Sequence, residues 1–387
     1  MTFVGMSLVV VAGLVSVWLT NRLARAPHFG PIDLPNDRTL HSAPTPRTGG
    51  LAVLTALAAA TLVAGALGWL SRPPWWDESV RIGAVFAVAA LVAVHAYWND
   101  LNGSTVLVRL GVQTGAATVT VLAAGLSLDR IGVPLGPFAV PVTVLGLVWM
   151  MNLYNFMDGM DGFAAGMTVF GFTALAGFAF RGGQSALAWA SLVVVAATAG
   201  FLIHNFPPAR IFLGDAGSVS LGFLAGSLSL LGVDERVFDP WVPILIFSPF
   251  IVDATATLGR RLLRGERVWR PHREHYYQRL VLAGWGHRNT VLAEYILMLA
   301  AGLSAATYVC ANVSIQECLL SLWAVIYCSC MCFVRALEIR RPKPTRLRVL
   351  LQYRCPLVVA LQLGTAILAH YAALWLRFDG DIPSAQT

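Results

Sequence analysis

Long uninterrupted apolar runs are the feature that most constrains how this chain can fold. They extend over about 17–22 residues each, which is enough for an α-helix to cross a lipid bilayer. Of the 387 residues, 57% are hydrophobic and 12% are charged, about half the charged fraction of an average soluble domain. The sequence therefore predicts an all-α fold, a polytopic transmembrane helical bundle of about 10–12 spans. The lipid bilayer is an expected partner, and no nucleic-acid partner is expected.

No long soluble insertion or internal repeat separates the runs, so one integral membrane domain is predicted for residues 1–387. The run at residues 3–19 has no basic residues before it and no small-residue cleavage site after it, which indicates a retained span and not a signal peptide. The expected spans lie at approximately 3–20, 49–70, 80–98, 106–126, 138–154, 163–180, 185–204, 217–232, 241–258, 289–310, 318–335 and 356–376.

Basic residues in the connections predict which side of the membrane each loop faces. Of the 27 Lys and Arg, 21 fall in one alternate set of connections and six in the opposite set. Because cytoplasmic loops carry the excess of Lys and Arg, the first set is expected in the cytoplasm and the N-terminus outside. The polar motifs of the chain all fall in that first set. A site at the cytoplasmic face of the membrane is therefore predicted.

The segment Asn152–Phe163 interrupts two apolar runs with paired amides and carboxylates. Asp158 and Asp161 are three residues apart, so on a helix they would share a face, with Asn155 one turn before Asp158. Buried carboxylates are costly unless they meet a counter-charge or a metal, which favours a functional cluster. The alternative is a helix-ending turn of Gly and Asp at the water interface.

A second polar segment, Phe212–Ser218, precedes a span expected to begin at about Gly217. Glycines let the backbone approach a ligand closely, and a helix N-terminus attracts phosphate. Asp215 would then hold a cation between the protein and the phosphate, or would only cap the helix. Mg²⁺, with Mn²⁺ as the alternative ion, suits one or two carboxylates plus phosphate oxygens better than a zinc arrangement does.

Two further polar loops carry histidines and arginines. In the most basic loop, His272 and His275 lie among arginines and tyrosines, a combination typical of anion recognition. A juxtamembrane basic patch that only sets topology or binds lipid headgroups is the alternative. In the first loop, Arg38, His41 and Arg47 lie among prolines. This combination predicts a rigid cationic strap.

Together these segments resemble the polyprenyl-phosphate N-acetylhexosamine-1-phosphate transferase superfamily (glycosyltransferase family 4), which includes phospho-MurNAc-pentapeptide translocase. The matching motifs are PxxRxxHxxPxPRxGG at 35–50, Asn99-Asp100, NxxNFMDGxDG at 152–162, FLGDAGS at 212–218 and HxxH at 272–275. They follow the family order over residues 33–280, so the family-like catalytic part is about 1–290, with additional C-terminal spans at 291–376. The histidine loop is most similar to the branch that initiates O-antigen synthesis.

The resemblance implies an enzyme of the bacterial cytoplasmic (inner) membrane. It would transfer an N-acetylhexosamine-1-phosphate from a UDP-sugar to undecaprenyl phosphate, release UMP, and initiate O-antigen or related surface polysaccharides. Asp215 and Asn155 would hold the Mg²⁺, and Asp100 would lie beside the lipid phosphate. The other implied residues shape the diphosphate and sugar pocket or bind substrate. They are Asp158, Asp161, His272 and His275 as catalytic residues, Asn205 and Phe212 at the uracil, and Arg38, His41, Arg47, Asn99, Asn152 and Arg273 as further substrate contacts.

One position departs from the family pattern, since Asn99 stands where the family usually has Asp. An amide cannot accept a proton, so either Asp100 alone suffices or the lipid phosphate attacks already ionised. Alternatives left open are the phospho-MurNAc-pentapeptide translocase of peptidoglycan synthesis, a membrane transporter, and a catalytically impaired lipid-binding relative. The sequence also leaves open monomer or homodimer, and it does not identify the sugar.

Overall fold

The structure, a computed structural model, describes residues 2–26, 29–35, 40, 43–68, 78–126, 135–267 and 272–340. The chain divides into two compact units, residues 1–251 with 287–305 and residues 252–286 with 306–387. Within the described ranges, 10 helices are long and apolar enough to cross a membrane, and the strands form one short antiparallel pair. The prediction of an all-α, polytopic helical bundle is confirmed.

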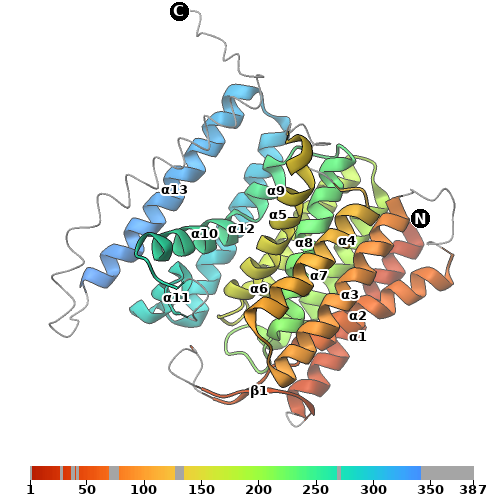
Figure 1. Ribbon diagram of the computed structural model, residues 1–387, viewed down its shortest axis with the longest axis horizontal. Coiled ribbons are helices and arrows are strands. Elements are labelled where there is room, and N and C mark those ends of the chain that lie inside the picture. Colours follow the sequence, from red (N-terminus) through yellow and green to blue (C-terminus); the bar gives the residue numbers. More distant parts are fainter. Residues whose placement is uncertain are drawn as a thin grey trace, which may run out of the picture. The chain divides into compact units, whose positions relative to one another are not determined.

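The first unit is a bundle in which helices α1–α8 run side by side (Figure 1). A short hairpin follows α1, with Ile32 opposite Pro46 and Asp33 opposite Thr45. The elements of this unit are α1 (Thr2–Arg25), β1 (Ile32–Asp33), β2 (Thr45–Pro46), α2 (Gly49–Ala66), α3 (Glu78–Asn102), α4 (Val106–Ala123), η3 (Gly136–Phe138), α5 (Ala139–Met157), α6 (Phe163–Arg181), α7 (Ser185–Asn205), α8 (Gly214–Asp234), α9 (Trp241–Ile246), the start of α10 (Ser248–Leu263) and most of α12 (Gly286–Cys310).

Helix α8 is the centre of this bundle, and nearly all of its side chains are buried. It packs against α2, α3, α5 and α6. Small residues permit the approach, because a methyl group on Gly222 would lie 2.5 Å from the carbonyl oxygen of Met150 in α5. Close contact through small residues is how helices associate in lipid, where the hydrophobic effect does not drive them together. Helix α8 therefore carries its first turn into the middle of one end of the bundle.

A buried arginine fastens the opposite end of the bundle. Arg81, in the first turn of α3, pairs with Asp234 and Glu235 at the end of α8. Its Nε donates to the carbonyl oxygen of Ala124, just after α4, at 2.9 Å. Gln184, which precedes α7, donates to Glu235 at 3.3 Å. This cluster ties together the ends of α3, α4, α7 and α8.

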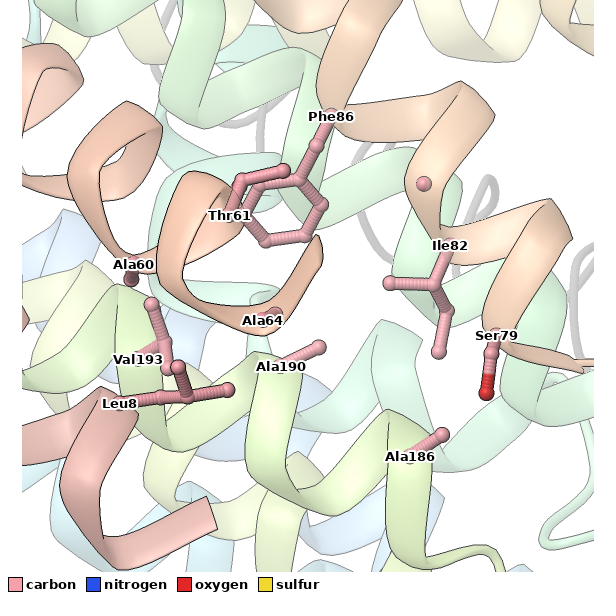
Figure 2. A pocket seen from close by; sticks show the side chains of 11 residues that line it. Leu8, Ala60, Thr61, Ala64, Ser79, Ile82, Phe86, Ala186, Ala190 and Val193 are labelled. Atoms are coloured by element: carbon pink, nitrogen blue, oxygen red, sulfur yellow. The ribbon is translucent and has the colours of Figure 1, made fainter. Parts of the chain in front are cut away.

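A small apolar pocket also lies at that end (Figure 2). The ends of α1, α2, α3 and α7 line it, with Leu8, Ile82, Phe86 and Val193 among the side chains. Its volume is about 50 Å³, room for only one or two water molecules, so it is a packing defect and not a substrate site.

The second unit contains the rest of α10, α11 (Tyr276–Leu280), a π-helical turn η4 (Val281–Trp285), the last turn of α12 and α13 (Val313–Arg340). Helices α11 and α13 are joined by a bidentate ion pair, in which the Arg279 guanidinium donates to both oxygens of Glu338 at 2.7 Å. Beside it the rings of Trp285 and Phe333 meet edge to face, with centroids 5.8 Å apart.

The span expected at 241–258 is wrong as a single helix, because α9 ends at Ile246 and α10 begins at Ser248. Pro249 lacks the N–H that would continue a helix from upstream, and the N–H of Phe247 closes α9 by bonding to Pro243 at 3.0 Å. The span expected at 356–376 lies outside the described residues. The single integral domain, with its family-like part at about 1–290 and extra spans at 291–376, stays a prediction.

Candidate active site

Two motifs that are far apart in the sequence join through their backbones at one end of the first unit. Gly49 N donates to Phe212 O at 2.9 Å, and Gly50 N donates to Leu213 O at 2.8 Å. A methyl group on Gly50 would lie 2.4 Å from the backbone nitrogen of Gly217, so this contact requires glycine. Two of the motif glycines therefore bring the first turns of α2 and α8 together.

Asp215, in the first turn of α8, is the centre of the resulting polar cluster. Its Oδ1 accepts hydrogen bonds from Asn155 Nδ2 at 2.9 Å and from Arg47 Nη2 at 3.1 Å. Its Oδ2 accepts from Asn99 Nδ2 at 3.2 Å. These donors are all side chains, and the cap residue of α8 is Leu213. The alternative in which Asp215 only caps the helix is therefore not the arrangement found.

Helix α8 begins at Gly214, which precedes the start expected at about Gly217. Gly214 has a φ of +74°, and a methyl group there would lie 2.8 Å from the carbonyl oxygen of Arg47. This turn presents the helix N-terminus to Asp100, whose Oδ2 accepts from Ala216 N at 3.3 Å. A carboxylate at that position is stabilised by the helix dipole.

Arg47 bridges two carboxylates, because its Nη2 also lies 3.4 Å from Oδ1 of Asp100. The Asp100 side chain is 2% exposed, whereas that of Arg47 is 33% exposed, so the cluster opens on the arginine side. Arg109 approaches from α4, with Nη1 3.9 Å from Asp215 Oδ2. The cationic strap predicted from the first loop thus supplies the counter-charge of the cluster through Arg47.

Asp158 is a further carboxylate near this arginine. Burial is the main cause that raises its pKa well above the usual range, and the charges of Asp215 and Asp100 act in the same direction. Arg47 and the backbone N–H of Gly214 oppose the rise. Arg47 is therefore a common counter-charge for Asp100, Asp158 and Asp215.

Asp158 and Asp161 do not share a helix face, contrary to the prediction. Helix α5 ends at Met157 and α6 begins at Phe163, so both residues lie in the turn between them. Gly162 ends this turn in the left-handed conformation, with a φ of +73°. The two carboxylates consequently serve different clusters, since Asp158 lies near Arg47 and Asp161 contacts His287.

Asp161 forms a second cluster on the wall of a cavity of about 460 Å³. Its Oδ1 lies 3.0 Å from Nδ1 of His287, and its Oδ2 accepts from Ala209 N at 3.0 Å. Nε2 of His287 lies 3.3 Å from the carbonyl oxygen of Leu40. The cavity is lined by Leu40, Ala43, Thr45, Asp161, Pro207, Pro208, Ala209, Phe212, His287 and Arg288.

The residues expected around the uracil are found close to this cavity. Phe212 lines it. Asn205 is buried and uses its amide on the backbone, donating to Ile211 O at 2.9 Å and accepting from Gly162 N at 2.9 Å. Asn152 instead donates to Gln113 Oε1 at 2.7 Å, on the neighbouring helix α4. Their roles toward substrate stay predictions.

The histidine loop belongs to the second unit. His275 is buried at the start of α11, and its Nδ1 lies 3.1 Å from Asp253 Oδ1. Asp253 also accepts from the backbone N–H groups of Tyr276 and Tyr277, at 2.9 and 3.1 Å. One carboxylate thus caps α11 and fixes the orientation of the His275 ring.

His272 lies beside His275, with ring centroids 4.9 Å apart. Burial, aided by the nearby charges of His275 and Arg261, lowers its pKa to about 4. The imidazole is therefore neutral, consistent with its Nδ1 accepting from Glu274 N at 3.2 Å.

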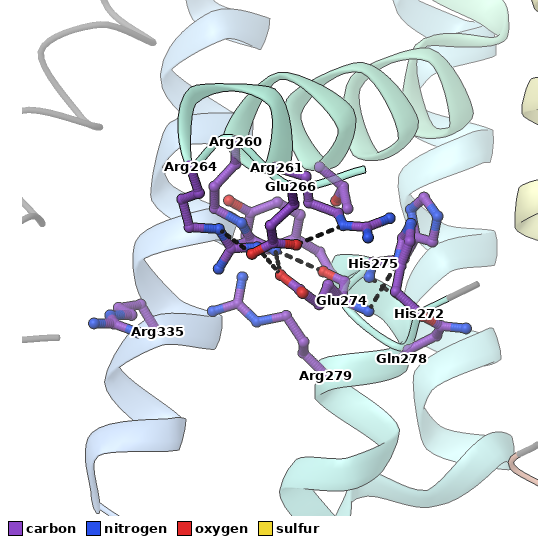
Figure 3. A network of polar contacts seen from close by, with 12 residues as sticks. Arg260, Arg261, Arg264, Glu266, His272, Glu274, His275, Gln278, Arg279 and Arg335 are labelled. Atoms are coloured by element: carbon purple, nitrogen blue, oxygen red, sulfur yellow. Dashed lines mark hydrogen bonds and ion pairs between the residues drawn. The ribbon is translucent and has the colours of Figure 1, made fainter. Parts of the chain in front are cut away.

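Several arginines of this loop form ion pairs with its glutamates (Figure 3), as Arg261 does with Glu266 at 2.9 Å and Arg264 with Glu274. Arg273 is half-buried between the two histidines in sequence. The catalytic roles of His272 and His275 and the substrate role of Arg273 stay predictions. The predicted contacts of Arg38 and His41 lie outside the described residues.

Comparison with known proteins matches the chain to one family and to several named relatives. A family model described as glycosyl transferase family 4 matches residues 82–233. A probable undecaprenyl-phosphate N-acetylglucosaminyl 1-phosphate transferase of Bacillus subtilis is 35% identical over 286 residues, which cover 72% of this chain and 77% of that protein. This chain belongs to glycosyl transferase family 4. The predicted resemblance to the polyprenyl-phosphate hexosamine-1-phosphate transferases is confirmed, and the chain is an enzyme.

Two other relatives extend the comparison. A decaprenyl-phosphate N-acetylglucosaminephosphotransferase of Mycobacterium leprae is 30% identical over 332 residues, 78% of this chain and 80% of that protein. A phospho-N-acetylmuramoyl-pentapeptide-transferase of Moorella thermoacetica is 31% identical over 284 residues, 69% of this chain and 86% of that protein.

Three residues of these clusters are not among those predicted from the sequence. They are Arg109 near the start of α4, His287 at the start of an apolar helix, and Asp253 within an apolar run. An ionisable residue inside an apolar run is a functional candidate, and that signal would have drawn attention to Asp253. Nothing local in the sequence reveals that His287 meets Asp161, which lies 126 residues away.

Proposed function

We propose that this protein transfers an N-acetylhexosamine-1-phosphate from a UDP-sugar to undecaprenyl phosphate and releases UMP. The observation that carries the proposal is the cluster in which Arg47 bridges Asp100 and Asp215. Carboxylates and guanidinium groups are drawn together at the end of an apolar bundle, where a phosphorylated membrane lipid would be presented. The names of the relatives support undecaprenyl phosphate as the acceptor.

The chemistry required is positioning and charge neutralisation more than covalent catalysis. Among the described residues, Arg47 and Arg109 are the arginines that contact Asp215, and they are suited to bind phosphate oxygens of the acceptor or donor. The lipid phosphomonoester, with a second pKa of about 6, is largely ionised at neutral pH and can attack without a protein base. Asn99 therefore does not prevent the reaction, and its amide helps to hold Asp215.

The donor atoms of the cluster fit a divalent cation such as Mg²⁺, with Mn²⁺ as the alternative. Asp100, Asp158 and Asp215 outnumber the cations Arg47 and Arg109 when all are ionised, and hard cations prefer oxygen ligands. Asp215 and Asn155 would hold the ion. Asn155 now gives its NH₂ to Asp215, and half a turn of the amide would present its oxygen instead. Bound there, the cation would neutralise charge on the donor diphosphate.

The reaction is assigned to the cytoplasmic face of a bacterial inner membrane because nucleotide sugars are cytoplasmic and the loops of this end carry the excess of Arg. UDP-GlcNAc is the favoured donor, on the strength of the relatives' names. O-antigen or a related surface polysaccharide is the proposed pathway. Phospho-MurNAc-pentapeptide transfer is the weaker alternative, and the assembly state, monomer or homodimer, is left to measurement.

The test is a transfer assay with the purified protein in detergent, radiolabelled UDP-GlcNAc, undecaprenyl phosphate and MgCl₂. The expected products are UMP and a labelled lipid with a diphosphate link. A panel of other UDP-N-acetylhexosamines and UDP-MurNAc-pentapeptide identifies the donor. A folded protein that yields no lipid product with any donor would overturn the proposal and favour the impaired relative, and label uptake by proteoliposomes would favour a transporter.

A further inference from the structure

The cavity beside Asp161 has walls from four separate parts of the chain. Leu40 and Thr45 come from the first loop, Asp161 from the turn after α5, Phe212 from the segment before α8, and His287 and Arg288 from the first turn of α12. All of them belong to the first unit. None of the sequence motifs includes residues of α12, so the motifs do not account for this wall of the cavity.

His287 joins three of these walls through a single ring. Nδ1 lies 3.0 Å from Asp161, Nε2 lies 3.3 Å from the carbonyl oxygen of Leu40, and Asp161 in turn accepts from Ala209 N. Nδ1 also lies 3.5 Å from the backbone nitrogen of Asp161, so one ring nitrogen is held by Asp161 and the other faces the carbonyl oxygen of Leu40. The side chain is only 18% exposed, so these contacts are largely shielded from water.

The same helix holds the turn at a second point, which is not part of the cavity lining. Tyr295 Oη donates to the carbonyl oxygen of Gly162 at 2.7 Å, and the tyrosine is not among the lining residues. Tyr295 thus anchors the backbone of the turn, whereas His287 orients the Asp161 carboxylate. The two residues allow loop anchoring and carboxylate positioning to be separated by experiment.

Arg288 gives the cavity a cation that can receive an anion. Its side chain is exposed at the cavity wall, and within the described ranges it has no ion-pair partner. The cavity therefore offers an aromatic ring at Phe212, an oriented acceptor at Asp161 and a guanidinium at Arg288. A nucleotide has a chemical partner for each group: an aromatic base for the ring, sugar hydroxyls for the carboxylate and phosphates for the guanidinium.

We infer that the first turn of α12 is part of the donor site, with His287 as a positioning residue for Asp161 and Arg288 as the contact for a phosphate of the nucleotide. This inference rests on the proposed function, because a nucleoside diphosphate sugar is the only anionic aromatic substrate in that reaction. The lipid acceptor has no aromatic base to fill this cavity, so we expect substitutions here to change the constants for the donor and not the KM for the lipid.

The experiment measures KM for UDP-GlcNAc, KM for undecaprenyl phosphate, kcat, the Kd for UMP and the melting temperature. In His287→Ala the donor KM and the Kd for UMP should rise about tenfold or more, since a hydrogen bond to a charged group is lost. His287→Asn, which restores an N–H near Nδ1, should recover part of this loss. Arg288→Gln should raise the same two constants about tenfold with an unchanged melting temperature. The lipid KM should stay within threefold throughout.

Tyr295→Phe and Asn289→Ala are the matched controls. Tyr295→Phe should lower the melting temperature and leave the donor KM within threefold, and Asn289→Ala, exposed on the same turn, should change neither. If Tyr295→Phe raised the donor KM as much as His287→Ala, or if Arg288→Gln kept the wild-type constants, the inference would be wrong while the transferase activity stood. A wild-type protein that neither binds UMP nor transfers sugar phosphate would instead overturn the proposed function, and the donor-site inference with it.

Discussion

Arg47 and Asp215 are 168 residues apart in the sequence, and their side chains meet at 3.1 Å. The same guanidinium reaches Asp100 at 3.4 Å. The carboxylates of Asp215 and Asp100 outweigh the effect of burial and raise the pKa of this arginine above its ordinary value. The polar end of the bundle therefore contains an arginine that is always charged and is held by the very carboxylates proposed to serve the reaction.

Replacing Arg47 by Ala should lower kcat/KM about a hundredfold. Two charge-assisted contacts are lost, and the carboxylates are left facing one another without their shared cation. Arg47→Lys keeps the charge but not the planar guanidinium whose Nη2 contacts both carboxylates, so it should retain an intermediate rate. Initial rates with both substrates, and melting temperatures of the purified variants, check this. Equal activity of the Ala and wild-type proteins would show that the bridge is only structural.

Asp215→Asn should abolish most turnover while the protein still purifies as a folded species. The substitution removes the charge on which Arg47, Asn99 and Asn155 converge. EDTA should abolish the activity of the wild-type enzyme, and addition of Mg²⁺ or Mn²⁺ should restore it. Full activity in EDTA would remove the metal from the mechanism, whatever the behaviour of Asp215→Asn.

Asn99→Asp should leave the rate within roughly tenfold, about 1.4 kcal/mol of barrier, because Asn99 is not the base. Its amide donates to Asp215, so a carboxylate there would place two like charges together unless a cation separates them. Asp100→Asn should cost far more, since Asp100 is buried between Arg47 and the N-terminus of α8. Steady-state rates of the two variants test both expectations. A hundredfold gain in Asn99→Asp would mark this chain as an impaired relative.

Stability should depend on His272 at acidic pH. The unfolded chain binds a proton on this residue near pH 6.5, whereas the folded protein does so only near pH 4. Between these values the unfolded state binds more protons, so stability falls as the pH is lowered from about 6.5 to 4. His272→Gln should therefore lose less melting temperature than the wild type between pH 8 and pH 5. An equal fall of the melting temperature in both proteins between pH 8 and pH 5 would contradict the pKa shift.

Arg81→Met should destabilise the protein by about 3 kcal/mol, because Asp234 and Glu235 would be left without their cation at a buried site. Arg236→Gln, at an exposed neighbouring position, is the control and should have little effect. Denaturation in detergent measures the stability of both variants. Turnover per folded molecule should be unchanged in Arg81→Met, since Arg81 lies at the end of the bundle away from Asp215.

The sequence by itself determined that the chain is a helical membrane protein and which polar residues matter. Buried charge is too costly in lipid to be placed without a purpose, so Asp100, Asp158, Asp161 and Asp215 stood out from the apolar runs. The length and hydropathy of those runs predicted nearly every span within the described residues. The prediction failed at 241–258, where Pro249 breaks a run that hydropathy alone reads as continuous.

Only the tertiary structure decided which of these residues act together. Asp158 and Asp161 are three residues apart, yet a turn that ends at a left-handed glycine directs one to Arg47 and the other to His287. Arg47 meets Asp215 because glycines let α2 and α8 touch at their first turns. Helix and strand periods act over a few residues, whereas partners such as His287 and Asp161 are set by the packing of whole helices. That packing minimises the free energy of the bundle as a whole, which no local pattern encodes.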